Sequence, residues 1–598
     1  MEIPARLKAL REELANRSLD AFIVPSSDPH QSEYVAGHWE TRAWLSGFTG
    51  SAGILVVTSD YAGLWTDSRY FLQAEQQLDG TGITMHKQGV PYAPEHLDWL
   101  GQHLHAGATV GVDGRLFSVN QVRRMLRVFD EYDIHLDYEQ DPIEAIWPDR
   151  PPRPDRPVIE HDLTYAGLSR AAKLQRVRSK MAEEEADYYL VSTLDDIAWV
   201  LNLRSDDVAF NPVFVSYLVI GKTSAFLFID EGKISKDLMA GLQEDGVQLK
   251  PYDQVGAFLA NRLPNDRVWL DLATTHIQHY NQLKDDQRLP GKNLIQPLKA
   301  CKNETEINHI REAMRKDGIA LTRFYRWLEA TLAGGETPTE YAVAERLAKF
   351  RAEQEGYRGE SFAAIVGYRG NGAIVHYRPL PATSAAIKPE GILLVDSGGQ
   401  YIDGTTDITR TIALSTPTPD QKRHYTYVLR GHIALSRQVF PAGTTGVQLD
   451  TLARQYLWGA GLNFGHGTGH GVGFFLNVHE GPQSISPNPR SPRTQQPLQP
   501  GMLTSNEPGY YLTGEYGIRI ENLVLCKEYL ETDQGAFYQF EPLTLFPIAT
   551  DLIDKSLMPP EDIAWLNNYH QQVYDGLAPL LEESDRLWLQ EKCQPLAT

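Results

Sequence analysis

The sequence has few cysteines, and their positions suggest neither a disulfide framework nor a zinc site. Only three occur among 598 residues, Cys301, Cys526 and Cys593, and none belongs to a CxxC pattern. A sparse, odd-numbered set is typical of reduced thiols in an intracellular protein. We therefore expect no disulfides and a cytoplasmic location.

Long hydrophobic stretches are also missing. The first residues, MEIPARLKALREEL, are charged and amphipathic and include no apolar segment of signal-peptide length. The most apolar stretch, residues 213–220, is far shorter than the roughly 20 residues that a membrane-spanning helix needs. The sequence therefore predicts no membrane partner.

Basic residues are in the minority, with 56 Lys and Arg against 77 Asp and Glu, for a formal net charge of -21. Nucleic acids need a basic face, and no basic cluster stands out, so we expect no nucleic-acid partner. Signatures of other chemistries are absent too. The glycine-rich segment HGTGHGVG matches neither the P-loop nor the GxGxxG pattern, and the chain has no GxSxG elbow for a serine nucleophile.

The length requires several domains, and weak internal similarity indicates how the first two are related. DAFIVPSSD at residues 20–28 and the later AWLSGF are echoed by residues 186–204, with Trp44 and Trp199 in matching places. Residues 146–162 are rich in proline and are typical of a linker. We expect two related α/β domains, at residues 1–155 and 156–300.

A third domain is expected from residue 301 to 598. Asn303 followed by Glu306 resembles a capping box. Apolar residues then recur at helical spacing: Ile307, Ile310, Met314, Leu321, Phe324 and Leu328. Beyond residue 540 the chain is predicted to be mostly helical, and this tail fits a subunit contact as well as a core element.

The chemistry is concentrated around LLVDSGGQYIDGTTDITRT, at residues 393–411. Asp396 ends a buried strand, where a carboxylate is costly unless its charge is compensated, and Asp407 follows 11 positions later. Downstream, HGTGH places two imidazoles in a loop rather than a helix, while NEPGYY and GIRIEN each supply a further acid. The candidate set is Asp396, Asp407, His470, Glu507 and Glu521.

Four carboxylates that converge on one site would repel each other and raise their own pKa values unless cations were present. Two divalent ions would balance them, and a carboxylate-rich set without thiolates suits Mn²⁺, Co²⁺ or Zn²⁺. Such a pair would generate hydroxide and polarise a carbonyl, which favours hydrolysis. Spacing alone leaves the ordinary readings open, in which a strand-end aspartate caps a turn and a histidine shapes a glycine loop.

Several segments together resemble the metallopeptidases of the pita-bread fold, and among them the cytosolic, three-domain aminopeptidase P (Xaa-Pro aminopeptidase) family. The segments are VDSGGQYIDGTTDITRT, HGTGHGVGFFLNVHEGP, NEPGYY and GIRIEN, with SDPHQSEYV, GLWTDSRYFLQAEQQLD, LDDIAWVLNLR, NPVFVSYLVIG, GAIVHYRP and WLNNYH along the rest of the chain. The resemblance implies an α/β architecture of two creatinase-like N-terminal domains and a catalytic pita-bread domain with a helical extension.

The resemblance also implies how the metals are bound. Asp396 and Asp407 would hold one ion, and Asp407 would bridge to the second. His470 and Glu507 would complete the coordination of the second ion, and Glu521 would bridge both ions; the implied metal is manganese. The implied reaction is removal of the first residue from peptides with proline at position 2 by a metal-bridged hydroxide, in an enzyme expected to form a homodimer.

Five residues are implied to act on the peptide or its reaction. Glu507 would also shuttle the proton. His376, His466 and His479 match histidines that position the substrate and stabilise the transition state, and Arg519 would orient the site carboxylates. His466 and Arg519 retain plainer readings, as a loop-shaping residue and a salt bridge.

Two alternatives stay open. A prolidase shares the metal set but cleaves only Xaa-Pro dipeptides, whereas a non-catalytic pita-bread protein binds partners after losing its ligands. The full-length resemblance favours the aminopeptidase over the first, and the complete ligand set argues against the second and against a metal-free creatinase-type hydrolase. Three further polar residues are expected to be structural: Asp403 in a turn, and His424 and His432.

Overall fold

The computed structural model describes residues 1–89, 93–262 and 266–597. It divides into two compact units, one formed by Met1–Leu163 with Leu168–Ile295 and the other by Thr164–Gly167 with Gln296–Thr598. The short helix α7 (Leu163–Ala166) lies where the chain changes unit. Among the described helices, none combines the length and the apolar character needed to cross a membrane.

The first unit begins with a six-stranded mixed sheet in the order β4-β3-β2-β1-β5-β6. β1 pairs antiparallel with β2 and parallel with β5, and its four residues are all buried. The strands are β1 (Ala21–Val24), β2 (Ile54–Thr58), β3 (Ala62–Thr66), β4 (Thr84–Lys87), β5 (Thr109–Val112) and β6 (His135–Asp137). The helices around them are α1 (Ile3–Asn16), α2 (Thr41–Ser46), α3 (Phe71–Gln77), α4 (His96–His103), α5 (Val119–Asp130) and α6 (Ile143–Ile146).

A second six-stranded sheet repeats this topology in the order β12-β11-β10-β8-β13-β14. Here β8 pairs antiparallel with β10 and parallel with β13, as β1 does with β2 and β5. The strands are β8 (Tyr188–Val191), β10 (Tyr217–Gly221), β11 (Ala225–Phe228), β12 (Val247–Lys250), β13 (Val268–Asp271) and β14 (Arg288–Gly291). The helices are α8 (Arg170–Glu183), α9 (Leu194–Leu201), α10 (Lys236–Glu244), α11 (Val255–Arg262) and α12 (Ile277–Asn281).

The matching strand order confirms the prediction of two related α/β folds. Trp44 lies in α2 and Trp199 in α9, which in each case is the helix that follows the first central strand. Residues 147–158 between the two sheets form neither helix nor strand. The proline-rich segment then joins the second sheet's region through β7 (Ile159–Glu160), which pairs with β9 (Leu203–Arg204).

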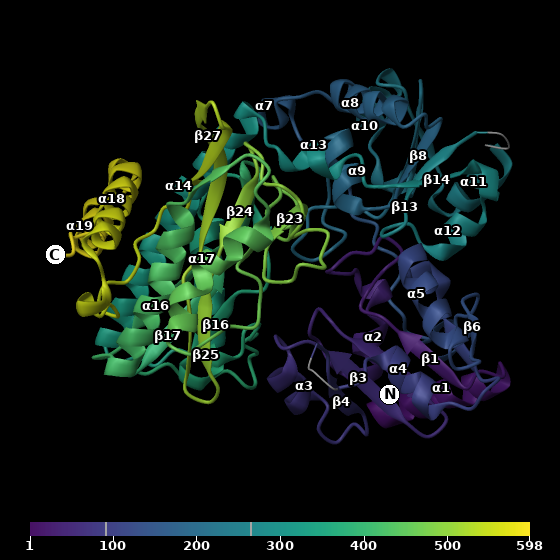
Figure 1. Cartoon of the computed structure of the whole chain (residues 1–598), viewed down its shortest axis with the longest axis horizontal. Coiled ribbons are helices and arrows are strands. Elements are labelled where there is room, and N and C mark those ends of the chain that lie inside the picture. The colour runs from purple at the N-terminus through teal and green to yellow at the C-terminus, as the bar shows by residue number, and fades with distance from the viewer. Residues whose placement is uncertain (90–92, 263–265, 598) are drawn as a thin grey trace. The chain divides into compact units, whose positions relative to one another are not determined.

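The second unit opens with α13 (Gln296–Ala300) and the long helix α14 (Glu304–Ala333). Asn303 is its N-cap, and the reciprocal bonds with Glu306 form the expected capping box. The predicted apolar stripe is buried, with Ile307 only partly so. Next comes α15 (Glu340–Ala352), and both helices pack on the strands that follow (Figure 1).

Antiparallel sheets form the rest of this unit. One has the order β16-β17-β20, and a larger one has the order β21-β28-β27-β24-β22-β23. Two small sheets, β15-β18-β19 and β25-β26, are formed by strands that alternate along the chain with those of the larger sheets. The strands of the two larger sheets are β16 (Ile365–Tyr368), β17 (Ile392–Ser397), β20 (Ile408–Ala413), β21 (Val439–Pro441), β22 (Gly469–Gly471), β23 (Glu480–Ile485), β24 (Leu503–Asn506), β27 (Asn522–Thr532) and β28 (Gly535–Pro542). The small sheets contain β15 (Tyr357–Glu360), β18 (Gly399–Tyr401), β19 (Gly404–Thr405), β25 (Gly509–Leu512) and β26 (Tyr516–Arg519).

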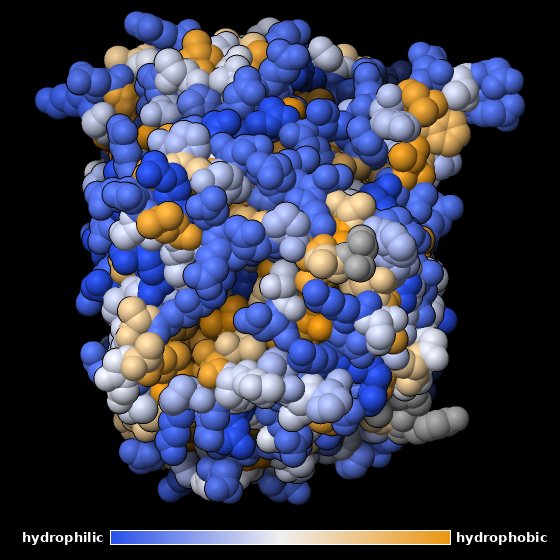
Figure 2. Space-filling model, turned by 90° about the vertical axis from the view of Figure 1, so that its left-hand side faces the viewer, coloured by the Kyte–Doolittle hydropathy of each residue, from blue (hydrophilic) through white to orange (hydrophobic). Residues whose placement is uncertain are grey.

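Helices α16 (Pro419–Ser436) and α17 (Gly446–Gly459) pack against these strands, and the chain ends in α18 (Pro560–Leu577) and α19 (Glu583–Lys592). Leu566, Tyr569 and Val573 of α18 lie in one apolar core with residues of α16 and β26. The extension is therefore part of this unit's core. Leu580 and Leu587 remain exposed on it, and Figure 2 shows apolar groups scattered among polar ones on this face.

Candidate metal centre

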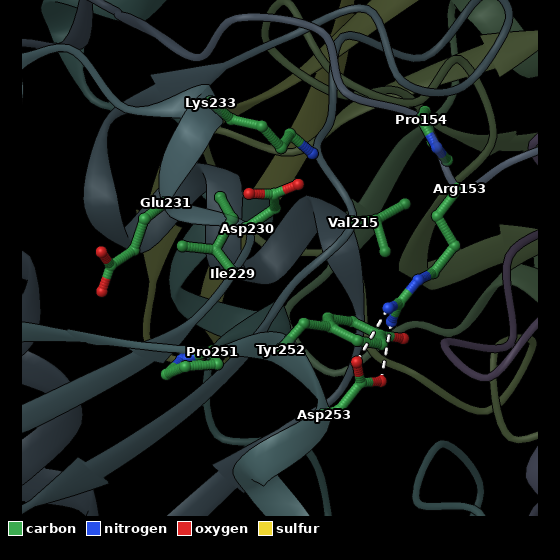
Figure 3. Close-up of a pocket in the computed structure, with 10 residues that line it drawn as sticks. All are labelled: Arg153, Pro154, Val215, Ile229, Asp230, Glu231, Lys233, Pro251, Tyr252 and Asp253. Atoms are coloured by element: carbon green, nitrogen blue, oxygen red, sulfur yellow. Dashed lines mark hydrogen bonds and ion pairs between the residues drawn. The ribbon is translucent and has the colours of Figure 1, made fainter.

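A cavity of about 340 Å³ lies in the first unit, between the proline-rich segment and the connections at the ends of strands in the second sheet. Its two basic groups already have acidic partners. Arg153 donates two hydrogen bonds of 2.8 Å to the carboxylate of Asp253 (Figure 3), and Lys233 is paired with the buried Asp207. No set of ligand-type side chains converges in this cavity among the residues that the structure describes, whereas one does in the second unit.

The two aspartates at the start of the site come from neighbouring strands. Asp396 lies near the end of β17, a strand whose six residues are all buried, and pairs across the sheet with Thr409 of β20. Asp407 directly precedes β20. Both side chains are buried, because the apolar residues on either side are drawn into the core. The fold thus buries two carboxylates side by side, where β17 ends and β20 begins.

The other three residues come from the larger sheet and its connections. His470 lies in the three-residue strand β22, where a loop was expected, and its backbone amide donates to Ser505 Oγ at 3.0 Å. Glu507 directly follows β24, and its amide donates to the Thr468 carbonyl at 2.8 Å. Glu521 lies between β26 and β27. Backbone hydrogen bonds thus fix the positions from which the side chains of His470 and Glu507 extend into the centre.

All five candidates meet in one place. Asp407, His470 and Glu521 offer ligand atoms that lie within 4.8 Å of one another. His470 Nε2 is 3.5 Å from Asp407 Oδ2 and 3.3 Å from Glu507 Oε1. Asp396 is close enough to Asp407 for their charges to interact. The sequence-predicted set is therefore a spatial cluster, although its members span 125 positions of the chain (521 minus 396).

Burial and mutual repulsion disfavour the ionised forms of these acids. Burial and the charge of Asp407 raise the pKa of Asp396 against the opposing effect of Arg519. Burial raises the pKa of Glu507 to about 7, and burial followed by the nearby acids raises that of Glu521 well above its ordinary value. Burial opposes protonation of His470, but the hydrogen bond to Asp407 and the charge of Glu507 outweigh it and raise its pKa to about 9.

This donor set fits a pair of divalent cations. It offers carboxylate oxygens and one imidazole without a thiolate, which suits hard or borderline ions. Asp396 Oδ1 is buried and has no hydrogen-bond partner among the described residues, as expected of an oxygen that faces a cation. Bound positive charge would also remove the repulsion that raises the carboxylate pKa values.

Arg519, at the end of β26, connects the cluster to its surroundings. Its side chain is buried and forms an ion pair with Asp396 Oδ2. It also donates to the Tyr511 hydroxyl at 2.6 Å and to Thr409 Oγ1 at 3.2 Å. Thr409 Oγ1 in turn donates to Glu521 Oε2 at 2.9 Å. Arg519 therefore orients two of the candidate ligands, one directly and one through Thr409.

The three predicted histidines lie around the cluster. His466 Nε2 is 2.7 Å from the Tyr511 hydroxyl. The ring of His479 packs edge-on against that of His470, with centroids 4.4 Å apart. His376 is half-buried and follows Val375, whose carbonyl accepts a 3.4 Å hydrogen bond from Arg519.

Sequence reasoning missed three polar residues of the centre, Tyr511, Thr409 and Ser505. Ser505 Oγ donates to Glu507 Oε1 at 3.1 Å and accepts from the amide of His470. Strand alternation contained a signal for Tyr511, because residues 507, 509 and 511 fall on one face of an extended segment. Thr409 is likewise two positions after Asp407.

The residues expected to be structural lie outside the cluster. Asp403 is in the turn between β18 and β19, and its buried carboxylate is paired with Lys316 and His309 of α14. His424 is 2.8 Å from the Tyr516 hydroxyl, and His432 is 3.1 Å from the Asn506 carbonyl. Each has a local partner that accounts for its burial.

Comparison with family models covers most of the chain. Residues 308–528 match the model of metallopeptidase family M24, and residues 536–596 match the C-terminal region of that peptidase. Residues 6–137 and 149–306 match two models of the creatinase/prolidase N-terminal domain. The duplicated sheets of the first unit correspond to these two matches.

Relatives and solved structures match over nearly the full length. The chain is 41% identical to Aminopeptidase P2 of Arabidopsis thaliana, over 97% of this chain and 86% of that protein. It is 39% identical to Xaa-Pro aminopeptidase 1 of Dictyostelium discoideum, over 99% and 97%. The X-prolyl aminopeptidase of Caenorhabditis elegans, described as a cytosolic enzyme with a di-nuclear active site, superposes with a TM-score of 0.95 at 34% identity and covers 100% of both chains. A Bacillus anthracis Xaa-Pro dipeptidase shares the fold over 64% of this chain and 99% of that one, with a TM-score of 0.50 at 23% identity.

Proposed function

The chain belongs to the Xaa-Pro aminopeptidases of metallopeptidase family M24, and from this premise we propose how its centre releases the first residue of a peptide whose second residue is proline. The reaction is metal-dependent hydrolysis of the bond between those two residues. The observation that supports it most is the convergence of four carboxylates, three of them buried, and one imidazole in the second unit.

We assign the five clustered residues as ligands of two divalent cations. Asp396, Asp407, His470, Glu507 and Glu521 would hold these ions through their carboxylate oxygens and one imidazole nitrogen. Manganese is the proposed metal, since oxygen-rich sites with one imidazole accept it readily. When bound, the ions supply Lewis acidity and a water molecule of lowered pKa.

The residues of the chain then perform three tasks. Glu507 accepts a proton from the attacking water and returns it to the proline nitrogen as the bond breaks. His376, His466 and His479 bind the peptide around the scissile carbonyl and donate hydrogen bonds as negative charge develops there. Arg519 keeps Asp396 oriented through their ion pair.

Proline explains why a dedicated site is needed. An Xaa-Pro bond lacks the N–H by which many proteases hold an extended substrate, and the ring fixes φ near −65°. A centre that holds the substrate carbonyl through histidines, with cations to polarise it, does not need that missing N–H. The free amine of the first residue is held near the acidic groups, which limits cleavage to the N-terminus.

The decisive experiment uses purified protein loaded with Mn²⁺ and the tripeptide Arg-Pro-Pro. Free arginine should be released, and its absence while bound metal is demonstrated would rule the activity out. An Arg-Pro dipeptide run in parallel separates this enzyme from a prolidase, which would cleave only the dipeptide. Metal analysis after dialysis tests the third reading, because a non-catalytic binding protein would retain almost no metal.

Further properties follow as proposals from the same relationship. The domains are proposed to span residues 1–155, 156–300 and 301–598. A homodimer is proposed, as is a cytoplasmic location, which agrees with the description of the Caenorhabditis elegans protein as cytosolic. Short peptides with proline in second position are the proposed substrates.

A further inference from the structure

A buried ion pair on α17 lies behind the segment that contains His466. Asp450 and Arg454 are one helical turn apart, and both side chains are 1% exposed. Arg454 Nε donates to Asp450 Oδ2 at 2.6 Å. Neither residue belongs to the candidate ligand set or to the three histidines.

The free ends of this pair reach residues 463–468. Arg454 donates to the Phe464 carbonyl at 2.7 Å and to the His466 carbonyl at 2.7 Å. Its guanidinium also stacks on the Phe464 ring, 3.7 Å from the centroid. The second oxygen of Asp450 accepts a 2.6 Å hydrogen bond from the Thr468 hydroxyl. The pair therefore forms hydrogen bonds with the segment on both sides of Gly467.

The segment connects two residues of the reaction. His466 is inside it, with its ring directed to the Tyr511 hydroxyl at 2.7 Å. The Thr468 carbonyl accepts a 2.8 Å hydrogen bond from the backbone amide of Glu507, the proposed proton shuttle. A shift of this segment would displace an imidazole that contacts the peptide and the backbone of the general base together.

The segment needs such support because its own sequence is permissive. Gly467 lies within it, and Gly469 and Gly471 follow directly in β22; glycines leave the backbone many conformations. Gly469 cannot be stiffened by substitution, since an added Cβ would lie 1.9 Å from the Ser505 carbonyl oxygen. Hydrogen bonds to the carbonyls of the segment limit this freedom, and charged donors form the strongest ones.

We propose that Asp450 and Arg454 are positioning residues for the hydrolysis, because they hold His466 and the backbone of Glu507 in register with the metal centre. This inference rests on the proposed function. It assigns to α17 a role in the reaction, although none of the five candidate ligands lies on that helix.

The first test compares Arg454→Lys with a matched substitution. Lysine keeps the charge beside Asp450 but cannot bond both carbonyls as the planar guanidinium does. Arg351, paired with Asp317 at 2.8 and 3.1 Å, is equally buried in the same unit but contacts neither the 463–468 segment nor the five candidate ligands. Arg351→Lys therefore reports the cost of disturbing a buried ion pair elsewhere.

On Arg-Pro-Pro with saturating Mn²⁺, Arg454→Lys should lower kcat on the order of 10- to 100-fold while KM changes less than about threefold, as expected for misplaced reacting groups. Arg351→Lys should lose similar thermal stability and keep kcat within about threefold. Bound metal, measured by elemental analysis, should equal wild type in both. Equal kcat losses in the two variants, or loss of metal in Arg454→Lys alone, would overturn the inference.

A milder pair of variants covers the case in which Arg454→Lys does not fold. Thr468→Val removes the hydroxyl that donates a hydrogen bond to Asp450, whereas Thr468→Ser retains it. We expect Thr468→Val to lower kcat about tenfold and Thr468→Ser to recover most of the loss. Equal activity of the two would contradict the role of Asp450. An inactive wild-type enzyme would instead refute the proposed function itself, so the two failures are distinguishable.

Discussion

The Tyr511 hydroxyl lies between His466 and Arg519, 2.7 Å from His466 Nε2 and 2.6 Å from Arg519 Nη1. Since Arg519 also pairs with Asp396, this phenol joins the histidine that we propose to bind the peptide to a carboxylate that we propose to bind metal. Burial raises the pKa of Tyr511 to about 12, so it remains a neutral donor and acceptor throughout the working pH range.

Tyr511→Phe should lower kcat about tenfold with metal content unchanged. The ring stays in place, but His466 loses the partner that fixes its orientation, and a buried hydrogen bond costs roughly 1–3 kcal/mol when one partner remains unsatisfied. Steady-state kinetics on Arg-Pro-Pro together with metal analysis provide the check. An unchanged kcat would show that His466 is oriented without the phenol.

Glu507→Ala should abolish measurable turnover while retaining part of the metal. The substitution removes the residue that we propose as both proton shuttle and ligand, but the other proposed ligands, Asp396, Asp407, His470 and Glu521, remain. Elemental analysis and peptide hydrolysis measured on the same preparation test both statements. Turnover above about a tenth of wild type would exclude Glu507 as the general base.

His479→Ala should lower activity with the metal site intact. Its ring packs on His470 without belonging to the cluster of ligand atoms, so its loss removes a contact to the peptide and leaves the donor set complete. We expect a kcat/KM on the order of 100-fold below wild type. A parallel loss of metal would contradict the assigned role and make His479 a structural support of His470.

Local sequence patterns predicted much of the fold. The capping box at Asn303 and Glu306 and the buried strand ending at Asp396 follow from periodicity and side-chain chemistry alone. Strand β22 did not, because GHG has little intrinsic strand preference and becomes extended only by pairing with β23 and β24. The role of the C-terminal extension was also open, since an amphipathic helix does not reveal whether its apolar face meets its own chain or a partner.

The candidate site shows the same division. The five clustered residues could be proposed from their types and from the family resemblance, and Asp403 could be set aside as a turn residue. Its two partners, Lys316 and His309, could not be named, because they are 87 and 94 positions away and meet it only through the packing of α14. The hydrogen bonds of Tyr511 and Arg454 could not be predicted either, because some of their partners are distant in sequence and the residues around them form no recognisable motif.

Tyr569→Phe should destabilise the second unit without a large effect on the reaction. The Tyr569 hydroxyl is 2.9 Å from the Thr544 carbonyl and accepts from Arg410 Nη2 at 3.1 Å, and Arg410 Nη1 donates to the Glu521 carbonyl at 2.6 Å. We expect a loss of about 1–2 kcal/mol in the free energy of unfolding and a kcat within about threefold of wild type, because Arg410 keeps its other acceptors.

The matched control for that variant is Tyr574→Phe on the same helix. Tyr574 is half-buried against the same core, and its hydroxyl has no hydrogen bond among the described residues. Its substitution should leave stability within about 0.5 kcal/mol of wild type. Equal destabilisation by the two variants would mean that the Tyr569 hydroxyl contributes nothing beyond the packing of its ring.

Acid should destabilise the second unit partly through His570. This side chain is buried in α18, and its Nε2 accepts the amide of Ile548 at 3.1 Å, which requires the neutral ring. Burial, with a contribution from the charge of Arg410, lowers its pKa from 6.5 to about 4. Between those two values the unfolded chain binds a proton that the folded chain refuses, so the free energy of unfolding falls as pH decreases from about 6.5 to about 4 and is unaffected by this group at higher pH.

The expected loss from this histidine is about 3 kcal/mol across that window. His570→Gln keeps an acceptor for Ile548 but cannot titrate, so the variant should gain on wild type as pH falls, whatever its deficit at pH 8. Urea unfolding of both proteins at half-unit steps from pH 8 to pH 4 measures the difference directly. A difference that stays constant over the range would show that the ring is already protonated in the folded state or that it exchanges its proton without breaking the bond to Ile548.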